Sequence, residues 1–108
     1  MKINKFFLFF LIIFTNNISN SFANEDVVQK GLEIFNGKGQ CAVCHILKDA
    51  GSQGNIGPNL DMVVVSLESV KNIVTNGQGV MPALGLDGIL TQDEVDIVSQ
   101  YVVIVANK

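Results

Sequence analysis

Five consecutive residues constrain this chain more than any other feature: Cys41-Ala42-Val43-Cys44-His45. The chain has two cysteines and one histidine, and all three lie in this stretch. Two thiols three residues apart on one helical turn can each bond a vinyl carbon of a porphyrin, and the next residue can then project its imidazole toward the iron. We therefore predict one covalently bound haem c, with Cys41 and Cys44 as thioethers and His45 as an axial iron ligand.

Other uses of a cysteine pair fit this sequence less well. A disulfide needs no histidine after it, and a thioredoxin-like C-x-x-C lies in a strand-helix-strand context that this chain lacks. A zinc site would need two more good ligands, and the chain has no further Cys or His to supply them. Haem attachment is the remaining interpretation of the motif.

The second axial ligand of the iron has to be a different kind of residue. His45 is the only histidine, so a bis-histidine haem within this chain is excluded. Outside the N-terminal segment, the candidates are Met62 and Met81. Met81 lies in a glycine-flanked loop before Pro82, which favours an extended backbone at Met81. Met62 lies in the apolar run 62–65, where methionines that fill a core belong. We therefore prefer Met81.

A ligating imidazole normally donates its other N–H to an acceptor that fixes the ring. The stretch Gly57-Pro58-Asn59-Leu60 follows the motif closely, and the restrained carbonyl of Pro58 is a candidate acceptor for His45 Nδ1–H. The same residues would mark an ordinary turn in any protein. Both interpretations stay open on the local sequence.

Residues 1–23 have the order of a secretory signal peptide. Two lysines precede the apolar run 6–14, and Ser21-Phe22-Ala23 has small residues at the two positions that a signal peptidase recognises. The apolar run is far shorter than the roughly 20 residues that span a bilayer, which argues against an uncleaved anchor. We expect export to the periplasm and cleavage after Ala23, which leaves a mature chain, residues 24–108, with no membrane span.

The mature chain is one small domain with an acidic balance. It keeps five basic and ten acidic residues, a formal charge of −5, which argues against a nucleic-acid-binding surface. The charge serves either solubility or steering toward a basic partner, and the sequence does not separate these. A domain of this size buries a modest core and often needs a cofactor to complete it.

Three segments have helical signals. Val28, Gly31, Leu32 and Phe35 have helical spacing in a helix that we expect to end at Gly37. A second helix begins after Ser66 and ends at Asn76-Gly77, and a third begins at a capping box made by Thr91 and Glu94. In that third helix, apolar residues follow at helical spacing: Val95, Val98, Val102 and Val105.

The remaining segments are less regular. Residues 37–61 are rich in glycine and poor in periodicity, so we expect a long irregular segment there. Residues 62–65 form a short apolar run that fits either a strand or a buried helix. Residues 78–90 form a second loop, which contains Met81.

Cys41 to His45, Gly57 to Leu60 and Met81-Pro82 follow one another in the order found in the class I cytochrome c family. The resemblance covers essentially the whole mature chain. The resemblance implies an all-α fold of three to five helices around one haem, and a shuttle for single electrons rather than an enzyme. It implies that Gly31 and Phe35 pack against Tyr101, that the Pro58 carbonyl accepts the His45 N–H, and that Leu60 packs on the haem. Gly57 belongs to the same haem-binding stretch.

The loop around Met81 is most similar to small members related to cytochrome c6, or to small cytochrome subunits of periplasmic dehydrogenases. We thus expect a periplasmic one-electron carrier with His/Met ligation. Its partners would be redox proteins, such as a dehydrogenase, a cytochrome complex, a terminal oxidase or a photosynthetic centre. One alternative is a fixed electron-transfer subunit of a periplasmic oxidoreductase complex. A haem-based gas sensor or peroxidase is a further and less favoured alternative.

Overall fold

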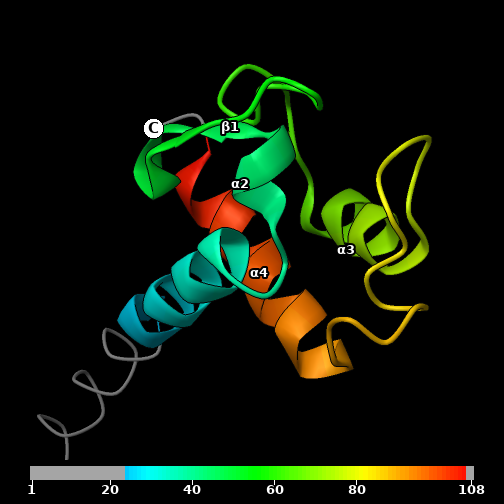
Figure 1. Ribbon diagram of the computed structural model, residues 1–108. Helices are drawn as coiled ribbons and strands as arrows, with labels where there is room; N and C mark the ends of the chain where they lie inside the picture. The colour runs from blue at the N-terminus through cyan, green and yellow to red at the C-terminus, as the bar shows by residue number, and fades with distance from the viewer. Residues whose placement is uncertain (1–23, 107–108) are drawn as a thin grey trace, which may run out of the picture.

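The computed structural model describes residues 24–106, and these residues are mostly helical (Figure 1). The predicted signal peptide, residues 1–23, lies outside the described residues. The described elements, in chain order, are a helix over residues 24–36, α2 (Cys41–Cys44), β1 (Ile46–Leu47), the 3-10 helix η1 (Lys48–Ala50), β2 (Ser52–Gln53), α3 (Leu67–Asn76) and α4 (Gln92–Val105). The helix over residues 24–36 is called the N-terminal helix below.

The core forms where the N-terminal helix crosses α4 (Figure 1). A Cβ built on Gly31 would lie 2.1 Å from Cβ of Tyr101, so the two backbones approach as closely as only glycine allows. The rings of Phe35 and Tyr101 pack edge to face with centroids 6.0 Å apart. This arrangement confirms the packing that the family resemblance implied.

Both later helices begin where the sequence predicts. The Ser66 hydroxyl accepts a hydrogen bond from the backbone N–H of Ser69 at 3.2 Å, and α3 ends before Gly77, which has φ 75°. At the start of α4, the side chain of Thr91 and that of Glu94 each accept a bond from the other's backbone N–H, as a capping box requires. The four valines predicted to face the core from α4 are all buried.

The segment between the N-terminal helix and α3 is more regular than expected. After α2, strands β1 and β2 pair antiparallel, with Ile46 opposite Gln53 and Leu47 opposite Ser52. The buried Ser52 hydroxyl accepts a hydrogen bond from Leu47 N–H at 2.9 Å and so extends the pairing. Strands of two residues are too short to show an alternating pattern, which is why no sequence pattern indicated them.

The apolar run 62–65 is neither the strand nor the buried helix that we considered. Asn59 C=O accepts a hydrogen bond from Met62 N–H at 3.1 Å, and this turn directs the following residues outward. Met62 is 79% exposed and Val64 is fully exposed. The expectation that Met62 fills the core is therefore wrong.

Along residues 24–106, no helix combines the length and the apolar character that crossing a bilayer would require.

Candidate haem-binding site

The two cysteines lie at the ends of α2, a single helical turn that faces the end of the β-hairpin. Both thiols are free of disulfides and partly buried. A Cβ built on Gly54 would lie 2.4 Å from the carbonyl oxygen of Val43, so the chain after β2 passes directly against the α2 backbone. The sequence thus brings Cys41 and Cys44 to one turn with their side chains unpaired.

The surroundings of Cys41 do not favour thiol-disulfide exchange. Burial, and to a smaller extent the nearby Cys44, raise the pKa of its thiol to about 11, against the opposing effect of a backbone hydrogen bond. The reactive cysteine of a redox C-x-x-C motif needs a lowered pKa, because the thiolate is the nucleophile. At neutral pH this thiol stays protonated. This agrees with the sequence, which lacks the strand-helix-strand context of a thioredoxin-like site.

His45 leaves α2 in an extended conformation, with φ −117° and ψ 139°, and its backbone N–H donates to Cys41 C=O at 3.0 Å. Its Nδ1 lies 2.7 Å from the carbonyl oxygen of Pro58. A carbonyl only accepts hydrogen bonds, so this contact places the imidazole proton on Nδ1. Nε2 then keeps its lone pair, as a metal-ligating histidine requires.

Gly57 lies against the face of that imidazole. A Cβ at this position would come within 2.6 Å of His45 Cε1 and 3.0 Å of Nδ1. The backbone N–H of Gly57 also donates to Cys44 C=O at 2.8 Å, which ties this stretch to the end of α2. The glycine is needed here because the chain must pass the ring at contact distance.

Leu60 lies two residues beyond Pro58, partly buried and packed against the core. Its backbone N–H donates to Ile46 C=O at 3.0 Å, next to the histidine. Asp61 then accepts a hydrogen bond from Lys48 N–H at 2.8 Å through its side chain. These bonds hold residues 57–61 beside the segment that follows α2.

Met81 lies in the loop between α3 and α4, half-buried and packed against the core. Its backbone N–H donates to Gln78 C=O at 3.0 Å, and its carbonyl accepts from Gln78 N–H at 3.1 Å. A Cβ on Gly77 would lie 2.7 Å from the Met81 carbonyl oxygen, so the loop is closed tightly behind it. Met81 therefore has a fixed backbone and a sheltered side chain, whereas Met62 has an exposed one.

These residues fit a covalently held haem. The chain offers two unpaired thiols on one turn, an imidazole with one nitrogen fixed and the other available, and a sheltered thioether in a separate loop. Over residues 24–106, no group of three or more His, Cys, Asp or Glu side chains is placed to hold a metal ion by itself. The fold and the site together define a c-type cytochrome.

The comparisons with known proteins agree. Residues 26–102 match the family model described as cytochrome c oxidase, cbb3-type, subunit III. The chain is 33% identical to cytochrome c6 of Gracilaria tenuistipitata var. liui over 106 residues (89% of each chain), and 32% identical to cytochrome c6 of Gloeothece citriformis over 95 residues (84% of this chain, 81% of the relative). The crystal structure of the c-type cytochrome SorU from Sinorhizobium meliloti matches with TM-score 0.70 and 46% identity, over 78% of this chain and 95% of that chain.

The chain therefore belongs to the class I c-type cytochromes. It is an electron-carrying protein, and its Cys41-x-x-Cys44 pair with His45 fits one covalently bound haem c. Membership of this family implies redox proteins as partners.

Sequence reasoning missed the polar contacts that tie the cysteine-bearing segment to α4. Lys38 Nζ lies 2.7 Å from Glu94 Oε1, and the Tyr101 hydroxyl donates to Asp49 Oδ2 at 2.7 Å. The capping box marked Glu94 as a polar residue with a local role, and nothing in the sequence pointed to Lys38 as its partner. Contacts over such separations depend on the fold, so no local pattern could predict them.

Proposed function

We propose that the chain is an exported, periplasmic one-electron carrier whose haem iron is bound by His45 and Met81 and whose thioethers are Cys41 and Cys44. The observation that carries the axial assignment is the 2.7 Å contact from His45 Nδ1 to Pro58 C=O, because it leaves Nε2 free to bind iron. The signal-like order of residues 1–23 supports export.

When bound, the haem supplies an iron that cycles between the ferrous and ferric states. The residues of this chain hold and tune that group. The Pro58 carbonyl orients the His45 ring and increases its basicity, and Gly57 and Leu60 form the haem-binding stretch around it. Met81 would supply a thioether as the second protein ligand of the iron, and a Met/His pair gives a higher reduction potential than more basic ligand pairs. With His45 and Met81 both bound to the iron, oxygen or peroxide would find no free ligand position.

The axial ligands are tested by changing each methionine. Met81→Ala should keep the haem covalently attached but give a high-spin iron that binds carbon monoxide rapidly in the reduced state. Met62→Ala is the matched control and should keep a low-spin visible spectrum. If Met62→Ala produced the high-spin spectrum instead, the assignment to Met81 would be wrong. Rapid carbon monoxide binding by the unchanged protein at neutral pH would favour a gas sensor or peroxidase.

A second candidate function is that of a fixed electron-transfer subunit in a periplasmic oxidoreductase complex. Two observations favour it: the matching family model is described as a subunit of an oxidase, and several large apolar side chains are exposed, among them Met62, Val64 and Val80. Size-exclusion chromatography of the protein extracted from its own cells, followed by absorbance of the haem, separates the two functions. A carrier elutes alone, and a subunit elutes with its complex.

A further inference from the structure

The helix that carries the cysteines has little of its own to hold it in place. α2 is 4 residues long, and a single isolated turn is unfavourable because it fixes many dihedral angles for few hydrogen bonds. No side chain caps its start. The preceding Gln40 has φ 52°, the left-handed region that a residue with a Cβ rarely adopts. Contacts with the rest of the fold must therefore determine where α2 lies.

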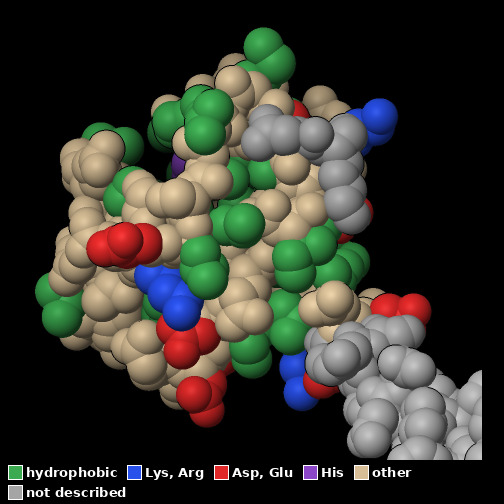
Figure 2. All heavy atoms as spheres, turned by 180° about the vertical axis from the view of Figure 1, so that it is seen from behind, with side chains coloured by type: hydrophobic (Ala, Val, Ile, Leu, Met, Phe, Trp, Pro, Cys, Tyr) green, Lys and Arg blue, Asp and Glu red, His purple; other side chains and the backbone are tan. Residues whose placement is uncertain are grey.

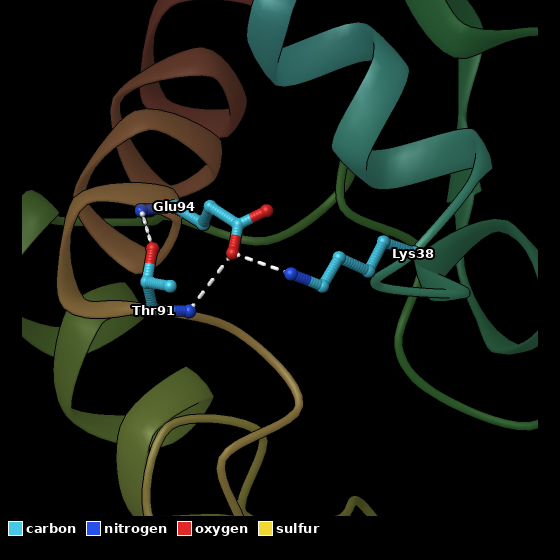
Figure 3. A network of polar contacts seen from close by, with 3 residues as sticks. All are labelled: Lys38, Thr91 and Glu94. Carbon is cyan, nitrogen blue, oxygen red and sulfur yellow. Dashed lines mark hydrogen bonds and ion pairs between the residues drawn. The ribbon is translucent and has the colours of Figure 1, made fainter.

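Ahead of α2, the chain is tied to α4 by an ion pair. Lys38 Nζ lies 2.7 Å from Glu94 Oε1 (Figure 3). The same oxygen accepts a hydrogen bond from Thr91 N–H at 2.9 Å, while Thr91 Oγ1 accepts from Glu94 N–H at 3.2 Å. The capping box thus orients the carboxylate before Lys38 reaches it. Less side-chain entropy is then lost than in an ordinary surface pair.

After α2, the chain is tied to the same helix by a second contact. Asp49, in η1, accepts a hydrogen bond from the Tyr101 hydroxyl at 2.7 Å. The Tyr101 residue is fully buried between α4 and the N-terminal helix, so its hydroxyl has a fixed position. Burial first, and the Asp49 carboxylate next, raise the pKa of Tyr101 far above its ordinary range, so the hydroxyl remains a donor at all physiological pH values.

The Lys38–Glu94 and Tyr101–Asp49 contacts lie on either side of the Cys41–His45 segment and end on the same helix. Glu94 and Tyr101 are seven residues apart on α4, which is about two turns and the same face of the helix. Lys38 and Asp49 lie on opposite sides of the Cys41–His45 segment in the sequence. One rigid helix of 14 residues therefore holds the chain both before and after α2.

We propose that α4 positions the Cys41–His45 segment for haem attachment through two anchors, the Lys38–Glu94 ion pair and the Asp49–Tyr101 hydrogen bond. The proposal rests on the proposed function, in which this segment binds the haem. The four residues are positioning residues: they act through the backbone that carries the cysteines and the histidine.

Two variants each remove one anchor and little else. Lys38→Met keeps the aliphatic stem and loses the ammonium, and Tyr101→Phe keeps the buried ring and loses the hydroxyl. Amide hydrogen exchange of the purified full chain, followed by mass spectrometry, is the measurement. Each variant should speed exchange in residues 38–49 about two- to tenfold, the effect of losing one hydrogen bond, and leave α3 unchanged. The double variant should also lower the fraction of chains with both thioether bonds, measured by intact mass.

Lys71→Met is the matched control. It removes the Lys71–Asp96 pair of 3.5 Å, which also ends on α4 but comes from α3. Charged pairs are not special to the two anchors, since Figure 2 shows basic and acidic side chains side by side at more than one place on that face of the molecule. Exchange in residues 38–49 should not change in this variant. Uniformly faster exchange along the whole chain in the anchor variants, or unchanged exchange in the double variant, would overturn the proposal. A failure of the proposed function is distinct, because it shows as unmodified Cys41 and Cys44 in the wild-type mass.

Discussion

At the scale of single residues, the site depends on how closely the backbone at Gly57 passes His45. The contact is set by the missing side chain: a methyl group would lie 2.6 Å from His45 Cε1. The ring would have to turn away from the Pro58 carbonyl, and the bond that fixes its proton on Nδ1 would be lost. The sequence allowed two interpretations of Gly57-Pro58, an ordinary turn or an acceptor for the imidazole, and the Pro58 carbonyl oxygen lies 2.7 Å from His45 Nδ1.

We predict that Gly57→Ala weakens axial ligation while the haem stays attached. The expected result is a mixture of high-spin and low-spin iron in the visible spectrum and a changed reduction potential. Gly88→Ala is the control, because Gly88 has φ 73° with nothing within 4 Å of a Cβ, so the substitution has only the backbone cost of about 1–2 kcal/mol. Equal spectra for both variants would show that His45 does not depend on the contact with Gly57.

At the scale of elements, prediction succeeded where the signal was local. The caps at Ser66 and Thr91 lie within four residues of the backbone groups that they satisfy, so the starts of α3 and α4 could be located from the sequence. The hairpin after α2 could not be located, since it depends on two pairs of residues and a buried hydroxyl. The Lys38–Glu94 pair joins elements far apart in the chain, and only the fold brings them together.

The start of α4 should make stability depend on pH. The hydrogen bond from Lys38, followed by that from the Thr91 backbone, lowers the pKa of Glu94 below its ordinary value of 4.5. A pKa that is lower in the folded state means that the ionised carboxylate stabilises the fold above pH 4.5, and that this contribution is lost as the pH falls through the folded-state pKa.

Glu94→Gln removes that titration but keeps a side chain that suits the capping box. We expect the melting temperature of the wild type to fall more steeply than that of Glu94→Gln as the pH drops from about 5 to about 3. Other carboxylates titrate in both proteins, so the difference between the two curves isolates Glu94. Parallel curves from thermal unfolding followed by circular dichroism would contradict this prediction.

At the scale of the whole molecule, the N-terminal helix and α4, the first and last helices of the described chain, cross and pack against each other (Figure 1). The family resemblance predicted this crossing from Gly31, Phe35 and Tyr101, and composition alone could not have done so. The class of fold and the cofactor were thus predictable from the order of a few motifs. The exposure of residues 62–65 was not, because an apolar run gives no information about the turn that precedes it.

Gly31→Ala should destabilise the whole fold rather than one helix. The added Cβ would lie 2.1 Å from Cβ of Tyr101, so the helices must separate, at a cost of about 1–3 kcal/mol or more. Urea denaturation should show a lower midpoint by both helix content and haem absorbance. If only one of the two signals shifted, the crossing would not be part of a single cooperative unit.

The Gly31–Tyr101 contact also has a consequence for the order in which the protein folds. The two residues lie far apart in the sequence, and contacts of such long separation are slow to form. The Cys41–Cys44 turn lies between them in the sequence, so it belongs to an incompletely folded chain until the N-terminal helix and α4 have packed together. Under the proposed function, that interval is when the two thiols would be most open to attachment chemistry.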